Sequence, residues 1–381
     1  MTGESVEQAR SGIGPAPDAA LVTAVALLTG CSLVMIHSTT APMASEGVLG
    51  ASPHFLRHAA ALILGALGGL AVSRLPLVLW RRLALPMWLV TVVLLVATLF
   101  FGVTVNGAQR WLEVPGLGLR FQPAEAAKLA TVLAVAALVA RGDGRPNSPA
   151  RLWAPTLLAL IPAALLVAQP DLGNAVVLLL LAGAILFVAG APVRVFAMPA
   201  LLGGAGISAY VATQTYAWNR LTGFLDPWAR ANDEGFQLVQ SFVGFARGGL
   251  TGVGIGDGRQ KLFYLPEAHT DFILSVIAEE AGLLGVLVVL GAFVAFVLAG
   301  LQIARNARDR FALLVGFGAT LVVALPAALN VAVVTGSIPP KGLPLPFVSY
   351  GRTAIMAAFF AAGLLIAVAN QAPAPAERFR R

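Results

Sequence analysis

Long apolar runs separated by short polar segments dominate the sequence. A helix needs about 20 apolar residues to cross the hydrocarbon layer of a membrane, and many of these runs reach that length. The pattern therefore predicts an all-α, polytopic integral membrane protein with about ten transmembrane helices. The expected spans lie near residues 19–38, 54–73, 85–104, 122–140, 154–169, 172–190, 193–213, 271–301, 309–336 and 346–369.

Composition agrees with this pattern, since 58% of the 381 residues are hydrophobic and only 11% are charged. A soluble domain carries about 25% charged residues, which solvate its surface. So few charges cannot cover a water-facing surface of this size, and lipid must surround most of the exterior. The single cysteine, Cys31, excludes an intrachain disulfide. The four histidines His37, His54, His58 and His269 form no metal-binding spacing.

Basic residues in the short loops predict the orientation of the spans. Cytoplasmic loops carry an excess of Lys and Arg. The 39–53 loop and the 169–173 turn carry neither. We therefore expect both termini in the cytoplasm, as tails 1–18 and 371–381 around a membrane domain 19–370. The basic residues that fall on one side of alternating spans are Arg74, Arg81, Arg82, Arg141, Arg145, Arg151, Arg194, Arg305, Arg308, Arg310, Arg378, Arg380 and Arg381.

The net charge of +7 is therefore a topology signal. The basic residues stand in short clusters at the ends of apolar runs, and no basic helix is interleaved with aromatic residues. The sequence thus gives no indication of nucleic-acid binding, which needs such a basic surface.

One large outer segment, about 214–270, lies between the seventh and eighth spans. Apolar residues at near-helical spacing in 234–250 predict an amphipathic helix, which is either interfacial or re-entrant in the membrane or merely rests on the bundle. Glycines at 252, 254, 256 and 258 follow, and then Arg259 and Lys261. Free backbone amides beside cations suit an anion such as pyrophosphate. Glycine spacing alone, without the residues that follow, would favour a flexible hinge.

Acidic residues near the eighth span are candidates for chemistry. Asp271 opens the span, where it is either a helix N-cap or a base that accepts a proton from an attacking hydroxyl. Glu279 and Glu280 follow roughly 12–13 Å further along the helix. Carboxylates at that depth are normally paired or functional.

Two further segments carry charged residues inside or next to the predicted membrane spans. Glu125 and Lys128 are three residues apart in the fourth span, and we expect an ion pair inside the bundle. PPKGLPLPFVSYGR at 339–352 cannot form a simple helix. Irregular backbone at this depth is tolerated where it lines a cavity or is buried. Lys341 and Arg352 flank the break and would give a cationic rim suited to phosphate.

These segments together resemble the SEDS family (shape, elongation, division and sporulation), whose members polymerise peptidoglycan. QPAE in the fourth span and Lys341 before GLPLP favour the cell-division branch, FtsW, over the elongation branch, RodA. The matching segments are NGAQRWL at 106–112, QPAEAAK at 122–128, QPDLG at 169–173, FLDPW at 224–228, GFQLVQS at 235–241, GGLTGVGIGDGRQKLFYLPEAHTDF at 248–272, AEEAG at 278–282 and KGLPLPFVSYG at 341–351.

The resemblance implies a glycosyltransferase that uses lipid II at the outer face of the bacterial cytoplasmic membrane, at the division septum. Asp271 matches the essential acidic residue of the family and would be the base, with Glu279 and Glu280 in support. No cofactor is evident, although a divalent cation (Mg or Mn) is compatible with this chemistry. The implied partner is a class B penicillin-binding protein transpeptidase. The candidate substrate-binding residues are Arg259, Lys261, Lys341, Arg247, Arg352, Glu125 and Lys128.

The chain departs from the family where SYG continues as RTA instead of GSS. Arg352 either adds a phosphate contact or remodels the turn. Other functions stay open beside the polymerase: a lipid II flippase, an elongation-type polymerase, and a division scaffold without catalytic activity. A flippase would need residues along the whole transmembrane path, whereas Asp271 and Lys341 lie together at the outer rim.

Overall fold

Each expected span corresponds to a helix of the computed structural model, which describes residues 17–41, 52–105, 108–114, 116, 119–141, 149–213 and 215–371. Six helices are long and apolar enough to cross a membrane, and shorter apolar helices accompany them. The predicted polytopic membrane fold is confirmed. The bundle helices are α2 (Pro17–Thr40), α3 (Pro53–Arg74), α4 (Leu77–Phe101), α5 (Pro123–Val139), α6 (Pro149–Ala168), α7 (Leu172–Val188), α8 (Arg194–Thr213), α11 (Ile273–Arg305), α12 (Arg310–Val334) and α13 (Arg352–Asn370). The predicted tails 1–18 and 371–381 lie almost wholly outside the described residues.

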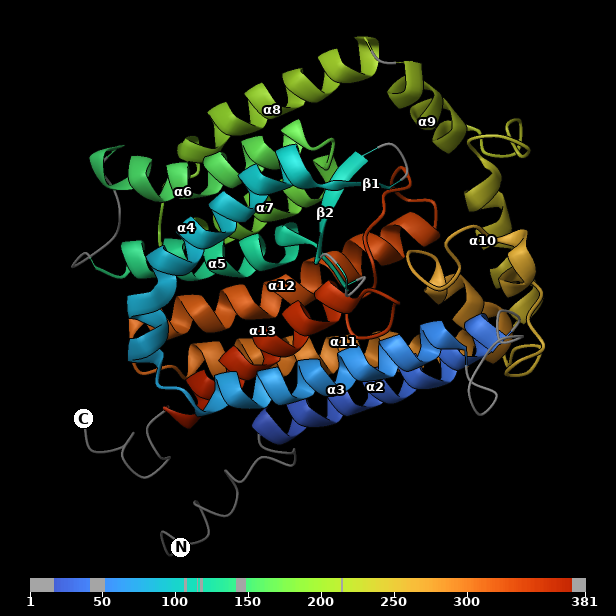
Figure 1. Cartoon of the computed structure of the whole chain (residues 1–381), viewed down its shortest axis with the longest axis horizontal. Helices are drawn as coiled ribbons and strands as arrows, with labels where there is room; N and C mark the ends of the chain where they lie inside the picture. The colour runs from blue at the N-terminus through green and yellow to red at the C-terminus, as the bar shows by residue number, and fades with distance from the viewer. Residues whose placement is uncertain are drawn as a thin grey trace, which may run out of the picture.

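Helix α5 runs through the middle of the bundle, between α4, α7, α12 and α13 (Figure 1). It is buried along nearly its whole length, and small residues such as Ala127, Ala130 and Ala134 allow close approach of its neighbours. Outer helices instead expose apolar side chains such as Val90 and Leu287. This inverted pattern is the one expected where lipid is the solvent.

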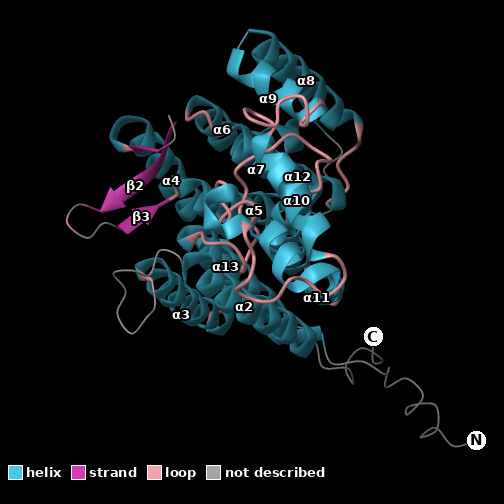
Figure 2. Ribbon diagram, turned by 90° about the vertical axis from the view of Figure 1, so that its right-hand side faces the viewer, coloured by secondary structure: helices cyan, strands magenta, loops and turns pink. Residues whose placement is uncertain are grey.

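A small sheet at one end of the bundle was not predicted. Strands β1 (Val103–Val105), β2 (Ala108–Val114) and β3 (Leu119–Phe121) pair antiparallel in that order (Figure 2). The Arg120 guanidinium lies 2.8 Å from the Glu113 carboxylate across the β2–β3 pair. The predicted helical membrane fold holds, and this sheet is an addition to it that the sequence did not indicate.

The outer segment contains helices α9 (Thr215–Leu225) and α10 (Phe236–Gly248), and then a π-helical turn, η2 (Gln260–Tyr264). The amphipathic helix predicted in this segment is thus confirmed as α10. It packs on α11, where the Ser241 and Ser275 hydroxyls lie 2.7 Å apart. Gly244 lies close to the Ser275 carbonyl, since a Cβ built on it would be 3.1 Å from that oxygen. The helix therefore packs on the bundle, and its position relative to the membrane stays a prediction.

Helix α11 is broken at Gly282, which has φ 67° and ψ −167°. The break frees backbone groups that the glycine-rich loop then satisfies. The carbonyls of Glu279 and Glu280 accept hydrogen bonds from the amides of Val253 (3.0 Å) and Gly254 (3.1 Å). On the other side, the Leu283 and Leu284 amides donate to residues 249 and 250 (2.9 and 3.1 Å). The loop therefore completes the broken helix, as buried backbone groups require.

Candidate active site

Asp271 lies immediately before α11, at the end of the bundle that also carries α10 (Figure 1). The N-cap of α11 is Phe272, and no side chain accepts a capping hydrogen bond there. The helix-cap interpretation of Asp271 is therefore not supported. Within the described residues its half-buried carboxylate has no hydrogen-bond donor, so it is available to a substrate.

The backbone around Asp271 is held by the 341–351 segment. Asn330 of α12 donates from its side-chain amide to the carbonyls of Asp271 (2.7 Å) and Leu343 (2.8 Å). The Tyr350 amide donates to the His269 carbonyl (2.8 Å), and the Ser349 hydroxyl donates to the Thr270 carbonyl. These bonds bring together two motifs that lie about 70 residues apart in the sequence.

Lys341 directly precedes the glycine against which the Asp271 carboxylate lies. A Cβ built on Gly342 would be 3.1 Å from the Asp271 Oδ2, so the carboxylate rests against this glycine. Lys341 is half-buried, and its side chain passes Gly173, whose built Cβ would lie 3.9 Å from the lysine Cδ. The predicted base and the predicted phosphate-binding lysine thus border one site. Its wall includes the start of α7.

Burial sets the electrostatics of this site. Burial and, to a smaller extent, the negative charge of Glu267 together raise the pKa of Asp271 to about 7, while Arg220 opposes the rise. Burial also lowers the pKa of Lys341, with Arg220 acting in the same direction. A carboxyl group with a pKa near neutrality suits proton transfer. Arg220, on α9, is a charged neighbour of the site that the sequence analysis missed.

A second group of polar residues supports the wall beside Lys341. The Asn174 side-chain amide donates to Asp171 Oδ2 (2.8 Å), and the Gln122 side-chain amide approaches the same oxygen at 3.5 Å. The Gln122 backbone amide donates to the Thr353 hydroxyl (3.2 Å). The QPAE, QPDLG and SYGRT segments therefore meet at this point.

Three of the four histidines, although far apart in the sequence, lie close together in the structure. His54, His58 and His269 surround Tyr350 with ring centroids 5.8, 5.9 and 5.6 Å from the tyrosine ring. This aromatic cluster packs against the segment that carries Asp271. Among the described residues, no three His, Cys, Asp or Glu side chains are arranged to hold a metal ion. A divalent cation stays a prediction.

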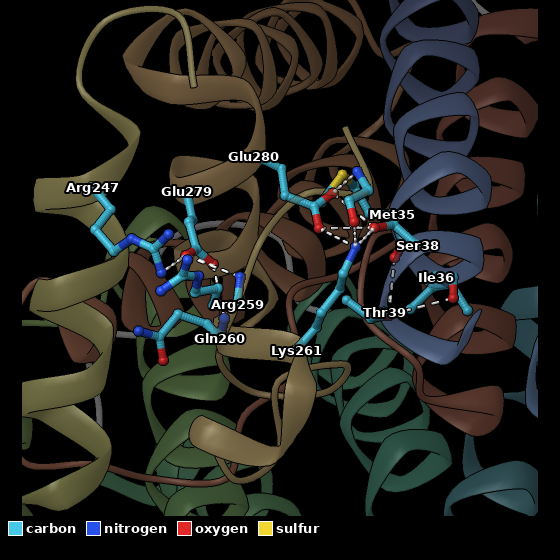
Figure 3. A network of polar contacts seen from close by, with 11 residues as sticks. Met35, Ile36, Ser38, Thr39, Arg247, Arg259, Gln260, Lys261, Glu279 and Glu280 are labelled. Carbon is cyan, nitrogen blue, oxygen red and sulfur yellow. Dashed lines mark hydrogen bonds and ion pairs between the residues drawn. The ribbon is translucent and has the colours of Figure 1, made fainter. Parts of the chain in front are cut away.

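Glu279 and Glu280 lie apart from this site, in a network of their own (Figure 3). Glu279 pairs with Arg247 (3.0 Å), and Glu280 pairs with Lys261 (2.8 Å). Both carboxylates are buried, as is Lys261. The structure thus brings four predicted site residues together, but in ion pairs with one another. No hydrogen bond or ion pair among the described residues joins this network directly to the Asp271 carboxylate.

The remaining candidates are placed separately. Glu125 and Lys128 form the expected buried ion pair (2.8 Å) and line a cavity of about 10 Å³ beneath Pro344 and Pro346. The Arg352 side chain, at the first residue of α13, makes no hydrogen bond or ion pair with the described residues, and the same is true of the Arg259 side chain. Both arginines therefore remain available to an anionic ligand.

Comparison with known proteins identifies relatives over most of the chain. The family of cell cycle proteins that comprises FtsW, RodA and SpoVE matches residues 19–373. A probable peptidoglycan glycosyltransferase FtsW of Marinobacter nauticus is 42% identical over 88% of this chain and 85% of its own. The corresponding protein of Geobacter sp. (strain M18) is 36% identical over 91% and 94%.

Solved structures show the same fold. A chain of a peptidoglycan synthase complex, described as coordinating polymerization and crosslinking, has a TM-score of 0.75 and 31% identity, covering 92% of this chain and 96% of its own. The rod shape determining protein RodA of Thermus thermophilus has a TM-score of 0.68 and 28% identity, with 93% and 97% covered. The chain therefore belongs to the FtsW/RodA/SpoVE family of cell cycle proteins, the SEDS family.

Proposed function

We propose that this protein polymerises lipid II into glycan strands at the outer face of the cytoplasmic membrane during septal wall synthesis. It is a multi-pass membrane protein and a peptidoglycan glycosyltransferase of the FtsW type, like the curated relatives that span most of its length. The observation that carries the proposed chemistry is the half-buried carboxylate of Asp271, which has no hydrogen-bond donor within the described residues and lies against Gly342, the residue after Lys341.

In the proposed reaction, Asp271 accepts the proton of the acceptor sugar 4-hydroxyl as that oxygen attacks the anomeric carbon of the donor. A new carbon–oxygen bond forms, the bond from the anomeric carbon to phosphate breaks, and its electron pair leaves with undecaprenyl pyrophosphate. Lys341, Arg352 and Arg259 would stabilise the negative charge on this leaving group. Positive charges that are already in place should contribute at least as much as the base does.

The orientation of the chain belongs to the same proposal. Helix α2 begins and α13 ends at one end of the bundle, and the α11–α12 turn with Arg305, Arg308 and Arg310 lies at that end as well (Figure 1). The positive-inside rule would place this end in the cytoplasm. Asp271, at the opposite end, would then face outward, where the sugar groups of lipid II are polymerised.

Purified protein in detergent, supplied with lipid II, should form glycan polymer that a gel resolves. Detergent removes the barrier between membrane leaflets, so a flippase would produce nothing new in this assay. Polymer formed by the wild type and absent from an Asp271→Asn variant supports the polymerase. Complete absence of polymer from the wild type, both alone and with its partner, would contradict it and favour a scaffold.

A partner is also part of the proposal. The similar chain described above belongs to a peptidoglycan synthase complex. We expect this protein to work with a class B penicillin-binding protein, a transpeptidase that cross-links the strands it makes. Adding that partner to the assay is expected to increase the rate of polymerisation.

A further inference from the structure

The glycine-rich loop already encloses two anions, and both belong to the protein. Glu279 and Glu280, with exposed fractions of 0% and 1%, lie on the outer part of α11, where the loop 249–262 wraps around them (Figure 3). Each carboxylate has one cation from the outer segment, Arg247 for Glu279 and Lys261 for Glu280. The four charges therefore balance within the protein.

Three backbone amides of the loop donate hydrogen bonds to these carboxylates. The Gly256 amide donates to Glu280 (3.0 Å), and the amides of Arg259 and Gln260 donate to Glu279 (3.1 and 2.9 Å). This is the arrangement in which successive backbone amides bind an anion. A Cβ built on Gly258 would lie 2.8 Å from one Glu280 oxygen, so the loop fits closely around the carboxylates.

The ammonium group of Lys261 has no hydrogen left to donate. It has three N–H donors. They reach the Glu280 carboxylate (2.8 Å), the Ser38 hydroxyl (2.9 Å) and the Gly256 carbonyl. Ser38 in turn donates to Glu280 (2.7 Å) and so connects α2 to the same network. A phosphate could bind Lys261 only by displacing these partners.

We infer that the glycine-rich loop and Lys261 bind the carboxylates of Glu279 and Glu280 in place of substrate pyrophosphate, and that Lys261 is a positioning residue. The ion pairs fasten the loop to the break in α11, on the helix that Asp271 immediately precedes. Substrate phosphate would then be left to Lys341, Arg352 and Arg259. This inference rests on the proposed polymerase function and assigns roles within its site.

Neutralising the ion pair from both sides tests the inference. Lys261→Met alone leaves Glu280 buried without its cation, and Glu280→Gln alone leaves Lys261 without its anion. Breaking a buried pair from one side is strongly destabilising, on the order of 10²-fold or more in the folded-to-unfolded ratio, whereas replacing both partners is often neutral. In the double variant Lys261→Met/Glu280→Gln, the glutamine still accepts from Gly256 and contacts Ser38.

The expected result is that each single variant lowers the thermal midpoint and the polymerisation rate. The double variant should return the midpoint to near the wild-type value and the rate to within about tenfold of wild type. A matched control is Lys341→Met with and without Glu280→Gln, in which no rescue is expected. If Lys261→Met and the double variant keep the wild-type thermal midpoint but are equally inactive, Lys261 binds substrate and the inference is wrong. The thermal midpoints test the ion pair even if the wild type makes no polymer, so the two proposals can fail separately.

Discussion

Replacing Asp271 by asparagine is expected to reduce glycan polymerisation by about 10²–10⁴-fold, the usual contribution of a general base. Asparagine has nearly the same shape but cannot accept the proton of the attacking hydroxyl. The backbone at this position is held by Asn330, which the substitution does not touch. The loss should therefore appear in the rate and leave the fold intact.

The raised pKa of Asp271 also predicts how the rate and the stability depend on pH. Its pKa is raised to about 7, so the wild-type rate should increase as the pH rises through 7 and the base becomes ionised. The raised pKa also means that the folded protein holds a proton that the unfolded chain releases above about pH 4. The stability contribution of Asp271 is therefore lost as the pH rises from about 4 to 7. The Asp271→Asn variant should be more stable than wild type at about pH 8, and nearly equal to it at about pH 4.

Initial rates of polymerisation from purified lipid II, measured beside thermal unfolding at both pH values, check this prediction. Asp233→Asn, an exposed residue of the outer segment, is a suitable control with expected wild-type activity. An Asp271→Asn variant that polymerises at nearly the wild-type rate would show that another group is the base.

Gly248→Ala is expected to have the largest effect on stability. A Cβ on Gly248 would overlap the carbonyl oxygen of Ala278, a backbone atom that cannot move aside without displacing α11. Overpacking typically costs about 1–3 kcal/mol, and a clash with backbone should lie at or above the upper end of that range. Helix α10 would separate from α11, and the loop that completes the broken helix would lose its anchor. Both folding yield and activity should fall.

Gly291→Ala is the matched control, since Gly291 lies on α11 with open space around its Cβ position. Alanine is favoured over glycine within a helix by about 0.5–1 kcal/mol, so this variant should be as stable as wild type or slightly more stable. Thermal unfolding of both variants in detergent gives the comparison. Equal midpoints for Gly248→Ala and Gly291→Ala would mean that the close α10–α11 contact is absent in solution.

The bundle could be predicted from the sequence because a membrane span requires a long apolar run, and every such run became a helix. The strands β1 to β3 were missed because β1 and β3 have only three residues each, and the sequence of β2, AQRWLEV, has no period-two alternation. The break in α11 was also missed. Its cause is Gly282 together with backbone groups from residues 249–254, a contact between distant parts of the chain.

The candidate site was predicted less completely. Asp271 and Lys341 were identified as candidates, and the Asp271 carboxylate lies against Gly342, the residue after Lys341. The residues that hold this part of the backbone in place were not identified. Asn330, for example, is a single polar residue in an apolar helix, and nothing in the sequence around it indicates its role. The same holds for Ser38, which contacts Lys261. The sequence indicated an anion beside the glycine-rich loop, but it could not indicate that Glu279 and Glu280 fill that place.

The central claim is that Asp271 faces the outer side of the membrane, and the labelling of single cysteines tests it most directly. In a Cys31→Ser background, Tyr264→Cys introduces an exposed thiol in the outer segment that leads to Asp271, and Arg308→Cys introduces one at the opposite end of the bundle. A maleimide that cannot cross membranes should label the Tyr264→Cys variant in intact spheroplasts, and the Arg308→Cys variant only after permeabilisation. The reverse pattern would place Asp271 in the cytoplasm and contradict the proposed reaction.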